Sequence, residues 1–144
     1  MIEINAFKSL ILAILEKLDN INTKTYNKVM QESLSQIGVF LDFDRVYITR
    51  YIGINKTVEI EFEFCNNAVK SLYDDLGIIS LESLKEAWTN LHMNGQTVSF
   101  DDVSKLDRNN QLFDMLNSLA IKSITTIPLM RDKKYLGFVG FENL

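Results

Sequence analysis

Few side chains in this sequence could take part in covalent or metal chemistry. There is one histidine, His92, and one cysteine, Cys65. A metal centre or a cysteine-histidine-acid catalytic site needs several such groups at characteristic spacings, and the sequence offers neither. We expect His92 to lie at the surface or at the rim of a pocket, with a heme-ligand or proton-switch role as the alternative. We expect Cys65 to be a structural thiol, because a single cysteine cannot form an internal disulfide.

Three glutamates, Glu59, Glu61 and Glu63, alternate with apolar residues in TVEIEFEF, residues 57–64. Clustered carboxylates could bind a cation or act as a general acid and base. Strict alternation instead places them on one side of a β-strand whose other side is covered, as at the edge of a sheet. We therefore interpret them as a solvated face and not as a catalytic or metal site.

Composition limits the classes of partner. The chain has 144 residues, 47% of them hydrophobic and 24% charged, and a formal net charge of -4. Such a chain has no basic field to attract nucleic acid or an anionic membrane surface. The apolar segment LILAIL near the N-terminus is far shorter than the roughly 20 residues that span a bilayer, and it lacks the features of a secretory leader. We expect one domain over residues 1–144, located in the cytoplasm.

Apolar residues at helical spacing mark the N-terminal region. Spacings of three and four predict a first helix with one apolar face, made of Ile4, Phe7, Ile11, Ile14 and Leu18. This face could lie on the protein's own sheet, or it could form a short heptad seam with a second subunit, which makes these five residues the candidate dimer interface. A second helix follows, for which Gly38 is the expected end.

A hairpin comes next, with strands at 44–52 and 57–64 and the turn GINK between them. If Ile52 faces Thr57, the expected pairs are Arg50 with Glu59, Thr49 with Ile60 and Tyr47 with Phe62. The alternation would then give the second strand an apolar face of Val58, Ile60, Phe62 and Phe64.

The remaining elements alternate helix and strand. We expect a helix over 80–93 capped by Ser80, a strand at 96–100, a helix near 112–119 and a closing hairpin over 121–142. Pro128 suits a strand end, while Gly137 and Gly140 leave room for a neighbouring segment or a ligand. This order predicts an α+β fold, with an antiparallel sheet and segregated helices.

The pattern resembles a GAF domain, a small-molecule sensory and regulatory domain of signalling proteins. Two helices lead into DRVYITRY, and the matching segments that follow are LHMNG, TVSFDDVSKL and above all IKSITTIPLMRDKKYLGFVGFEN. The resemblance covers essentially the whole chain. It implies N-terminal helices on one face of the sheet and mid-chain helices and loops on the other. A PAS-like fold is disfavoured because two helices precede the first hairpin.

The resemblance also implies a small-molecule site between the sheet and roughly residues 65–120. The candidate ligand-binding residues combine aromatic walls with hydrogen-bonding groups: Tyr47, Thr49, Trp88, Phe100, Asp101, Asp102 and Thr125. Core packing is the alternative role for the aromatic residues, and helix capping for the two aspartates. Similar domains continue into a C-terminal helix, so we expect this chain to be excised from a longer protein and to lack that helix.

Several branches of the resembling family are disfavoured. No Cys-His dipeptide is present, unlike in bilin-attaching GAF domains, and the signature of cyclic-nucleotide-binding relatives is absent. Relatives that reduce free methionine sulfoxide use several cysteines, whereas one cysteine has no resolving partner. The sequence identifies no cofactor.

We therefore expect a non-enzymatic sensory domain from a bacterial-type signalling protein such as a sensor histidine kinase or diguanylate cyclase. It would bind a small molecule, form a homodimer through its terminal helices, or both. The alternatives are a ligand-free dimerisation scaffold of the same fold and a redox enzyme of the methionine sulfoxide reductase type.

Overall fold

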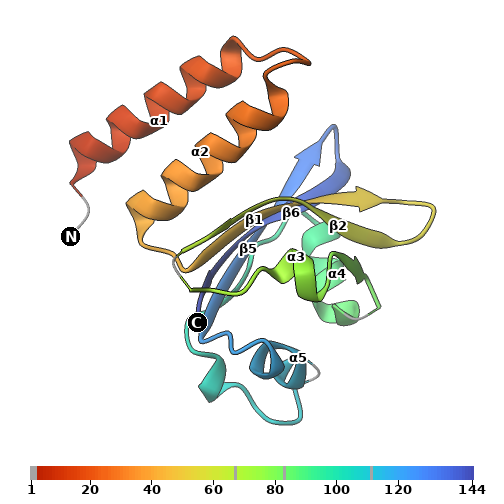
Figure 1. Ribbon diagram of the computed structural model, residues 1–144. Helices are drawn as coiled ribbons and strands as arrows, with labels where there is room; N and C mark the ends of the chain where they lie inside the picture. Colours follow the sequence, from red (N-terminus) through yellow and green to blue (C-terminus); the bar gives the residue numbers. More distant parts are fainter. Residues whose placement is uncertain (1–2, 67, 83, 111) are drawn as a thin grey trace.

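The computed structural model describes residues 3–66, 68–82, 84–110 and 112–144. Its centre is a curled six-stranded sheet in the order β3-β2-β1-β6-β5-β4, antiparallel throughout (Figure 1). The strands are β1 (Arg45–Ile52), β2 (Thr57–Cys65), β3 (Ile78–Ser80), β4 (Val98–Phe100), β5 (Ser123–Arg131) and β6 (Lys134–Asn143). The α+β prediction and both hairpins are confirmed. The closing strand β6 lies at the centre of the sheet, between β1 and β5.

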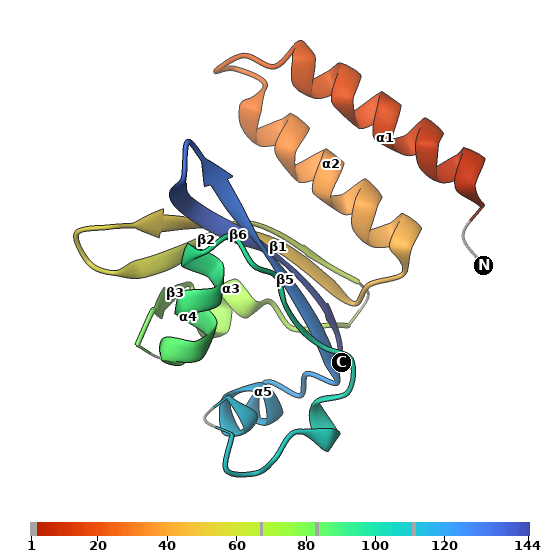
Figure 2. The same ribbon diagram turned by 180° about the vertical axis from the view of Figure 1, so that it is seen from behind.

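The two N-terminal helices cover one face of the sheet. Helix α2 (Tyr26–Leu41) packs on β1 and β2, and α1 (Ile4–Asp19) packs on α2, farther from the sheet (Figures 1 and 2). Ile14 of α1 is buried, and the ring of Phe7 lies 6.0 Å from that of Phe40 in α2. The expectation that the first helix lies on the sheet is therefore wrong, because α2 occupies that place.

Gly38 does not end the second helix as predicted. Helix α2 continues to Leu41, and Asp42 adopts the left-handed conformation that closes it. Gly38 is buried, and a Cβ atom there would lie 2.2 Å from the ring of Phe64. The glycine serves close helix-sheet packing and not helix termination.

The first hairpin departs from the predicted register at one point. Arg50 faces Glu59 and Thr49 faces Ile60 as expected, but Ile48 then faces Phe62, so that Glu61 is an extra residue in β2. Such a β-bulge shifts the pairing by one residue. The predicted Tyr47-Phe62 pair is therefore wrong, and Tyr47 faces Glu63.

The bulge exchanges the faces of β2. Val58 and Ile60 join the core on the mid-chain side, whereas Phe62 and Phe64 join the core under α2. A single apolar face for this strand is therefore a wrong prediction, and so is its edge position, because β3 pairs along its outer side. Glu63 now lies on the mid-chain side among polar partners described below.

Mid-chain elements cover the opposite face: α3 (Leu72–Asp75), α4 (Lys85–Met93), the 3-10 helix η1 (Val103–Lys105) and α5 (Phe113–Ser118) (Figure 2). The helix predicted from residue 80 begins only at Lys85, because Ser80 belongs to β3. The arrangement implied by the resemblance is thus present, with helical cover on both faces of the sheet.

Two glycines let β1 approach β6 closely. A Cβ atom on Gly137, whose φ is 138°, would lie 2.1 Å from the carbonyl oxygen of Thr49. A Cβ atom on Gly140 would lie 2.3 Å from Cζ of Tyr47. The space left by both glycines is filled by β1 itself, which identifies the neighbouring segment anticipated from the sequence.

Candidate functional site

A small cavity, which we call the chamber, lies between the sheet and the mid-chain elements. Its volume is about 20 Å³, close to the smallest void that holds one water molecule. Its walls come from β1, β5, β6, α3, β3, α4 and α5 and from the residues beside them, and they consist of Tyr47, Leu72, Leu76, Ile79, Leu84, Trp88, Met115, Leu116, Leu119, Ile121, Ile124, Phe138 and Glu142. Hydrocarbon side chains therefore fill nearly all of the space between the sheet and the mid-chain elements.

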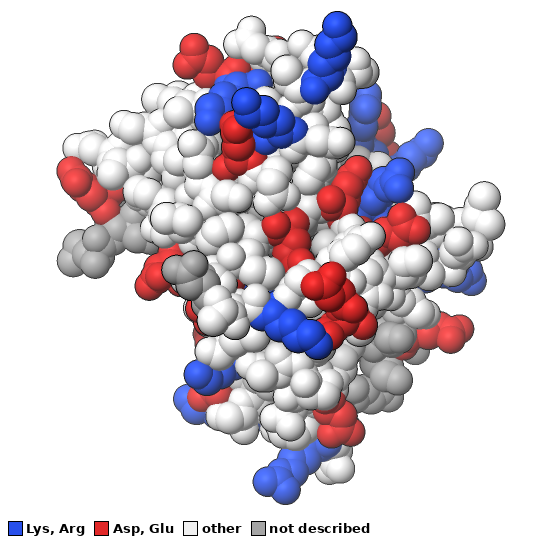
Figure 3. All heavy atoms as spheres, in the orientation of Figure 1, with Lys and Arg blue, Asp and Glu red and all other residues white. Residues whose placement is uncertain are grey.

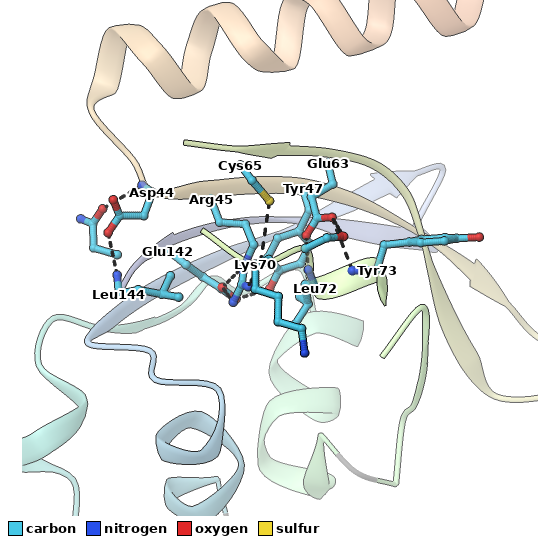
Figure 4. A network of polar contacts seen from close by, with 12 residues as sticks. Asp44, Arg45, Tyr47, Glu63, Cys65, Lys70, Leu72, Tyr73, Glu142 and Leu144 are labelled. Carbon is cyan, nitrogen blue, oxygen red and sulfur yellow. Dashed lines mark hydrogen bonds and ion pairs between the residues drawn. The ribbon is translucent and has the colours of Figure 1, made fainter. Parts of the chain in front are cut away.

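A buried polar cluster of Arg45, Tyr47 and Glu142 adjoins the chamber, and two of its members, Tyr47 and Glu142, belong to the chamber wall (Figure 4). Arg45 and Glu142 face each other across β1 and β6, and Nε of Arg45 donates to Oε2 of Glu142 at 2.7 Å. A second nitrogen, Nη2, bonds the same oxygen. Tyr47 Oη donates to Oε1 at 2.8 Å. The carboxylate therefore has donors on both oxygens.

The cluster also reaches the segment that covers the chamber. Nη1 of Arg45 donates to the carbonyl oxygen of Lys70 at 3.0 Å, just before α3 (Figure 4). Burial raises the pKa of Glu142, although Arg45 and the Tyr47 hydrogen bond act in the opposite direction. Burial and the nearby Glu142 charge raise the pKa of Tyr47. Arg45 and Glu142 thus satisfy each other, and neither charge is left over for a ligand.

Glu63 fixes the start of α3. Its carboxylate accepts from the backbone nitrogen of Leu72 at 2.6 Å and from Oγ of Ser71 at 2.5 Å (Figure 4). A carboxylate at a helix N-terminus satisfies backbone donors that have no partner within the helix. Glu63 therefore has a structural partner, which corrects its interpretation as part of a solvated face.

Cys65 ends β2 beside this segment, half-buried, with Sγ 3.9 Å from the carbonyl oxygen of Lys70. Burial, with a smaller contribution from Glu63, raises the pKa of its thiol to about 11. The thiol is protonated at neutral pH and is a poor nucleophile.

His92 is 1% exposed, so the expectation of a surface or rim position is wrong. Trp88 Nε1 donates to its Nε2 at 3.1 Å, and Thr126 Oγ1 lies 2.9 Å from the same nitrogen. Because an indole N–H can only donate, Nε2 is an acceptor, and the proton resides on Nδ1, 3.1 Å from Tyr135 Oη. This network fastens α4 to β5 and β6.

Two of the seven predicted ligand-binding residues, Tyr47 and Trp88, lie together in the chamber wall. Thr49 is buried within the sheet, where its Oγ1 accepts from the backbone nitrogen of Phe138 at 2.9 Å. Phe100 packs half-buried at the edge of the core. Neither Thr49 nor Phe100 lines the chamber.

Asp101 and Asp102 lie on an open groove of about 900 Å³ outside the chamber. Asp102 caps η1 by accepting from the backbone nitrogen of Ser104 at 3.0 Å, which matches the capping alternative. Thr125 points to the other face of the sheet, where its Oγ1 lies 2.7 Å from Oγ of Ser99. Its neighbour Thr126 faces the chamber side instead.

Sequence reasoning missed Arg45, Glu142 and the role of His92. Arg45 and Glu142 are 97 residues apart, so only the register of β1 against β6 brings them together. The available signal was a charged residue at the end of each of two apolar strands. Such residues are ordinarily exposed unless they are paired.

Other kinds of site are not evident in the parts of the chain that the structure describes. Within residues 3–66, 68–82, 84–110 and 112–144, no three His, Cys, Asp or Glu side chains are grouped to hold a metal ion. No helix there is long and apolar enough to cross a bilayer. On the face in Figure 3, acidic and basic side chains are interspersed and form no continuous field of one sign.

Solved structures that are similar to this chain include GAF domains. The chain is similar to the phycocyanobilin-bound GAF domain of a cyanobacterial phytochrome, with a TM-score of 0.79 and 14% identity over 94% of this chain and 79% of that one. It is similar to the blue-light absorbing form of the Thermosynechococcus elongatus PixJ GAF domain, with a TM-score of 0.65 and 18% identity over 90% and 72% of the two chains.

A third similar structure is the chromophore-binding domain of a bacteriophytochrome from R. palustris, with a TM-score of 0.73 and 13% identity over 99% of this chain and 54% of that one. No protein-family model and no curated protein matches the sequence. At these identities the likeness establishes the fold, and the chain has the GAF fold that its sequence resembles.

The buried ion pair leads to a stability prediction. Arg45→Met or Glu142→Leu alone should each lower the free energy of unfolding by about 3–5 kcal/mol, because each leaves one buried charge unpaired. The double variant should recover most of that loss, although the Tyr47 hydroxyl loses its acceptor and the Lys70 carbonyl loses the Arg45 donor. Urea denaturation of the four proteins measures the coupling.

The exposed pair Arg50 and Glu59, 3.3 Å apart, is the matched control. Arg50→Met and Glu59→Leu should each change stability by less than about 1 kcal/mol. If the losses for Arg45→Met and Glu142→Leu simply add in the double variant, the two charges do not depend on each other and our account of the cluster is incorrect.

His92 gives a prediction on pH. Burial lowers its pKa from 6.5 to about 4 in the folded protein, so the unfolded chain takes up a proton first as the pH falls. Stability should be constant above pH 6.5 and fall below it by about 1.4 kcal/mol per pH unit, levelling off near the folded pKa after a loss of about 3 kcal/mol.

Urea unfolding between pH 7 and pH 5 measures this slope while most carboxylates stay ionised. His92→Gln should abolish it, since the chain has no other histidine. An unchanged slope in this variant would assign the pH dependence to other groups.

Proposed function

We propose that this chain, with its GAF fold, is a non-enzymatic sensory domain that regulates a cytoplasmic signalling protein by binding a small molecule in the chamber. The observation that carries the proposal is the chamber itself, an apolar cavity enclosed between the sheet and the mid-chain elements with Tyr47 and Trp88 in its wall. Solved neighbours of the same fold support it, because two of them are described as bilin-bound GAF domains.

Ligand binding would require the wall to move. Pockets for drug-sized molecules occupy about 300–1,000 Å³, far more than the present 20 Å³. The least buried residues of the wall are Leu76, at 38% exposure, and the half-buried Met115 and Leu119. These three side chains form the rim through which a ligand would pass.

The polar cluster offers a path for the signal. A shift of the segment before α3 would act on Arg45 through the carbonyl of Lys70. The next residue in β1, Val46, is buried on the opposite face in the core under α2. Binding would therefore change the packing of α2 and α1 if the ligand prefers one of two wall positions.

The ligand we propose is not a covalently attached bilin. Cys65 is the sole thiol, it does not line the chamber, and its raised pKa keeps it protonated. The same properties argue against a sulfoxide reductase, which would also need a resolving cysteine.

A second candidate function is a ligand-free scaffold that dimerises through α1. The small volume of the chamber favours it, as does an exposed apolar edge of α1 made of Ile4 at 69%, Leu12 at 67% and Leu15 at 54% exposure. Ile14 and Phe7 of the predicted interface face α2 instead. The proposed interface is therefore rotated toward Ile4, Ile11, Leu12 and Leu15.

Binding can be tested with the protein's own fluorescence. Trp88 is the single tryptophan and lines the chamber, so a bound molecule should change its emission. Native mass spectrometry of freshly purified protein should show an added small-molecule mass, whose removal shifts the Trp88 emission. Leu119→Phe, which fills the rim, should bind less. Protein that carries no added mass and responds to no compound in a ligand library would favour the scaffold.

Dimerisation has a separate test. Leu15→Asp should weaken the dimer at least tenfold in sedimentation equilibrium, because it places a charge in the apolar contact. Ile54→Asp is the matched control, since Ile54 is 98% exposed in the β1-β2 turn. Ile14→Asp is unsuitable because Ile14 is buried against α2. A wild-type protein that is monomeric throughout would exclude this interface.

A further inference from the structure

The charged groups nearest the chamber already have partners. Glu142 is the one carboxylate among the described lining residues, and the cation beside it is Arg45. The carboxylate of Glu63, behind the cover, is bonded to Ser71 and to the backbone nitrogen of Leu72. Three nitrogens of Arg45 are engaged, two with Glu142 and one with the carbonyl of Lys70. Both side chains are at most 3% exposed.

An anionic ligand would have to separate this pair. It would bind Arg45 only after Glu142 had left, which strands a carboxylate in a hydrocarbon environment. If Glu142 stayed in place, its charge would repel the anion. A carboxylate or phosphate group therefore finds no available cation in the chamber.

A cationic ligand meets the same obstacle in reverse. It would compete with Arg45 for Glu142, and the displaced guanidinium would be buried without a counterion. The nearby neutral polar groups offer no replacement, because Trp88, His92, Thr126 and Tyr135 already bond one another. The part of the wall that remains available to a ligand is therefore hydrocarbon.

The wall side chains that can be displaced most easily are those of the rim. Leu76, Met115 and Leu119 are less buried than the rest of the wall, and methionine is unbranched and adapts to new shapes. Displacing these side chains makes room for a ring or two. A nucleotide or a tetrapyrrole would require the α3 and α5 regions to separate.

We propose that the chamber selects uncharged, hydrocarbon-rich molecules of one or two rings, and that the Arg45-Glu142 pair excludes ionic ligands of the same size. This inference rests on the proposed function, since it names the ligand class of the same site. It predicts which matched compounds bind before the natural ligand is identified.

The test uses three probes of similar shape: toluene, benzoate and benzylammonium. Binding to the wild-type protein is followed by Trp88 emission and by the thermal unfolding midpoint. Toluene should bind at least tenfold more tightly than either ion. Equal binding of toluene and benzoate would overturn the selectivity while leaving ligand binding in the chamber intact.

Two variants sharpen the result. Glu142→Gln frees Arg45 from its counterion, so benzoate should bind this protein at least tenfold more tightly than wild type, and the ratio of benzoate to toluene affinity should rise by a similar factor. Arg50→Gln, which alters an exposed arginine, should leave both unchanged. If Glu142→Gln gains no affinity for benzoate, the ion pair does not exclude anions.

Leu116→Ala separates the two failures. Leu116 lines the chamber and is 1% exposed, so its truncation enlarges the cavity. If no probe binds wild type but toluene binds Leu116→Ala in preference to both ions, the selectivity holds and the sensory proposal fails. If the enlarged chamber shows no preference for toluene, the selectivity is overturned.

Discussion

The buried Arg45-Glu142 pair is the constraint on which the rest of the structure depends. It forms only if β6 enters the sheet beside β1 in one register, because a slip of one residue would turn either side chain toward α2. The register also needs Gly140, whose missing side chain lets the Tyr47 ring lie across β6 and reach Glu142. Since an unpaired buried charge is so unfavourable, the pair acts against every alternative register.

A second constraint is that the sheet must support two cores. In β1, Arg45 and Tyr47 face the chamber while Val46 and Ile48 face α2, which is ordinary alternation. In β2 the bulge at Glu61 resets the alternation, so that its first half serves the chamber side and its second half serves α2. The bulge thereby turns Glu63 toward the N-terminus of α3. One inserted residue links the cover of the chamber to the packing of the N-terminal helices.

The sequence was sufficient for features that depend on neighbours in the chain. Apolar spacing predicted α1 and α2, and β-branched alternation predicted both hairpins, because such patterns report local geometry. It failed where a shift of one residue determines which face of the sheet a side chain occupies. Thr125 was predicted to bind a ligand, although Thr126 points to the chamber side. Glu61 was predicted to follow the regular alternation of β2, although it forms the bulge. It failed again for Arg45, Glu142 and His92, whose burial is possible only through partners in distant segments. Polar residues of this kind look like surface residues until the strand order is known.

The chamber and the N-terminal helices share the strands of the sheet, so any coupling between them would pass through β1 and β6. Arg45 is bonded to the mid-chain cover and to β6, and the adjacent Val46 belongs to the core under α2. A close-packed interior transmits a displacement of one side chain to its neighbours, since it contains little free volume. Under the proposed function, a molecule that pushed the rim outward would move the Lys70 segment, and Arg45 would then either lose its hydrogen bond to that carbonyl or shift together with Glu142. The ion pair that fixes the register is thus also the element best placed to carry a change from one face of the sheet to the other.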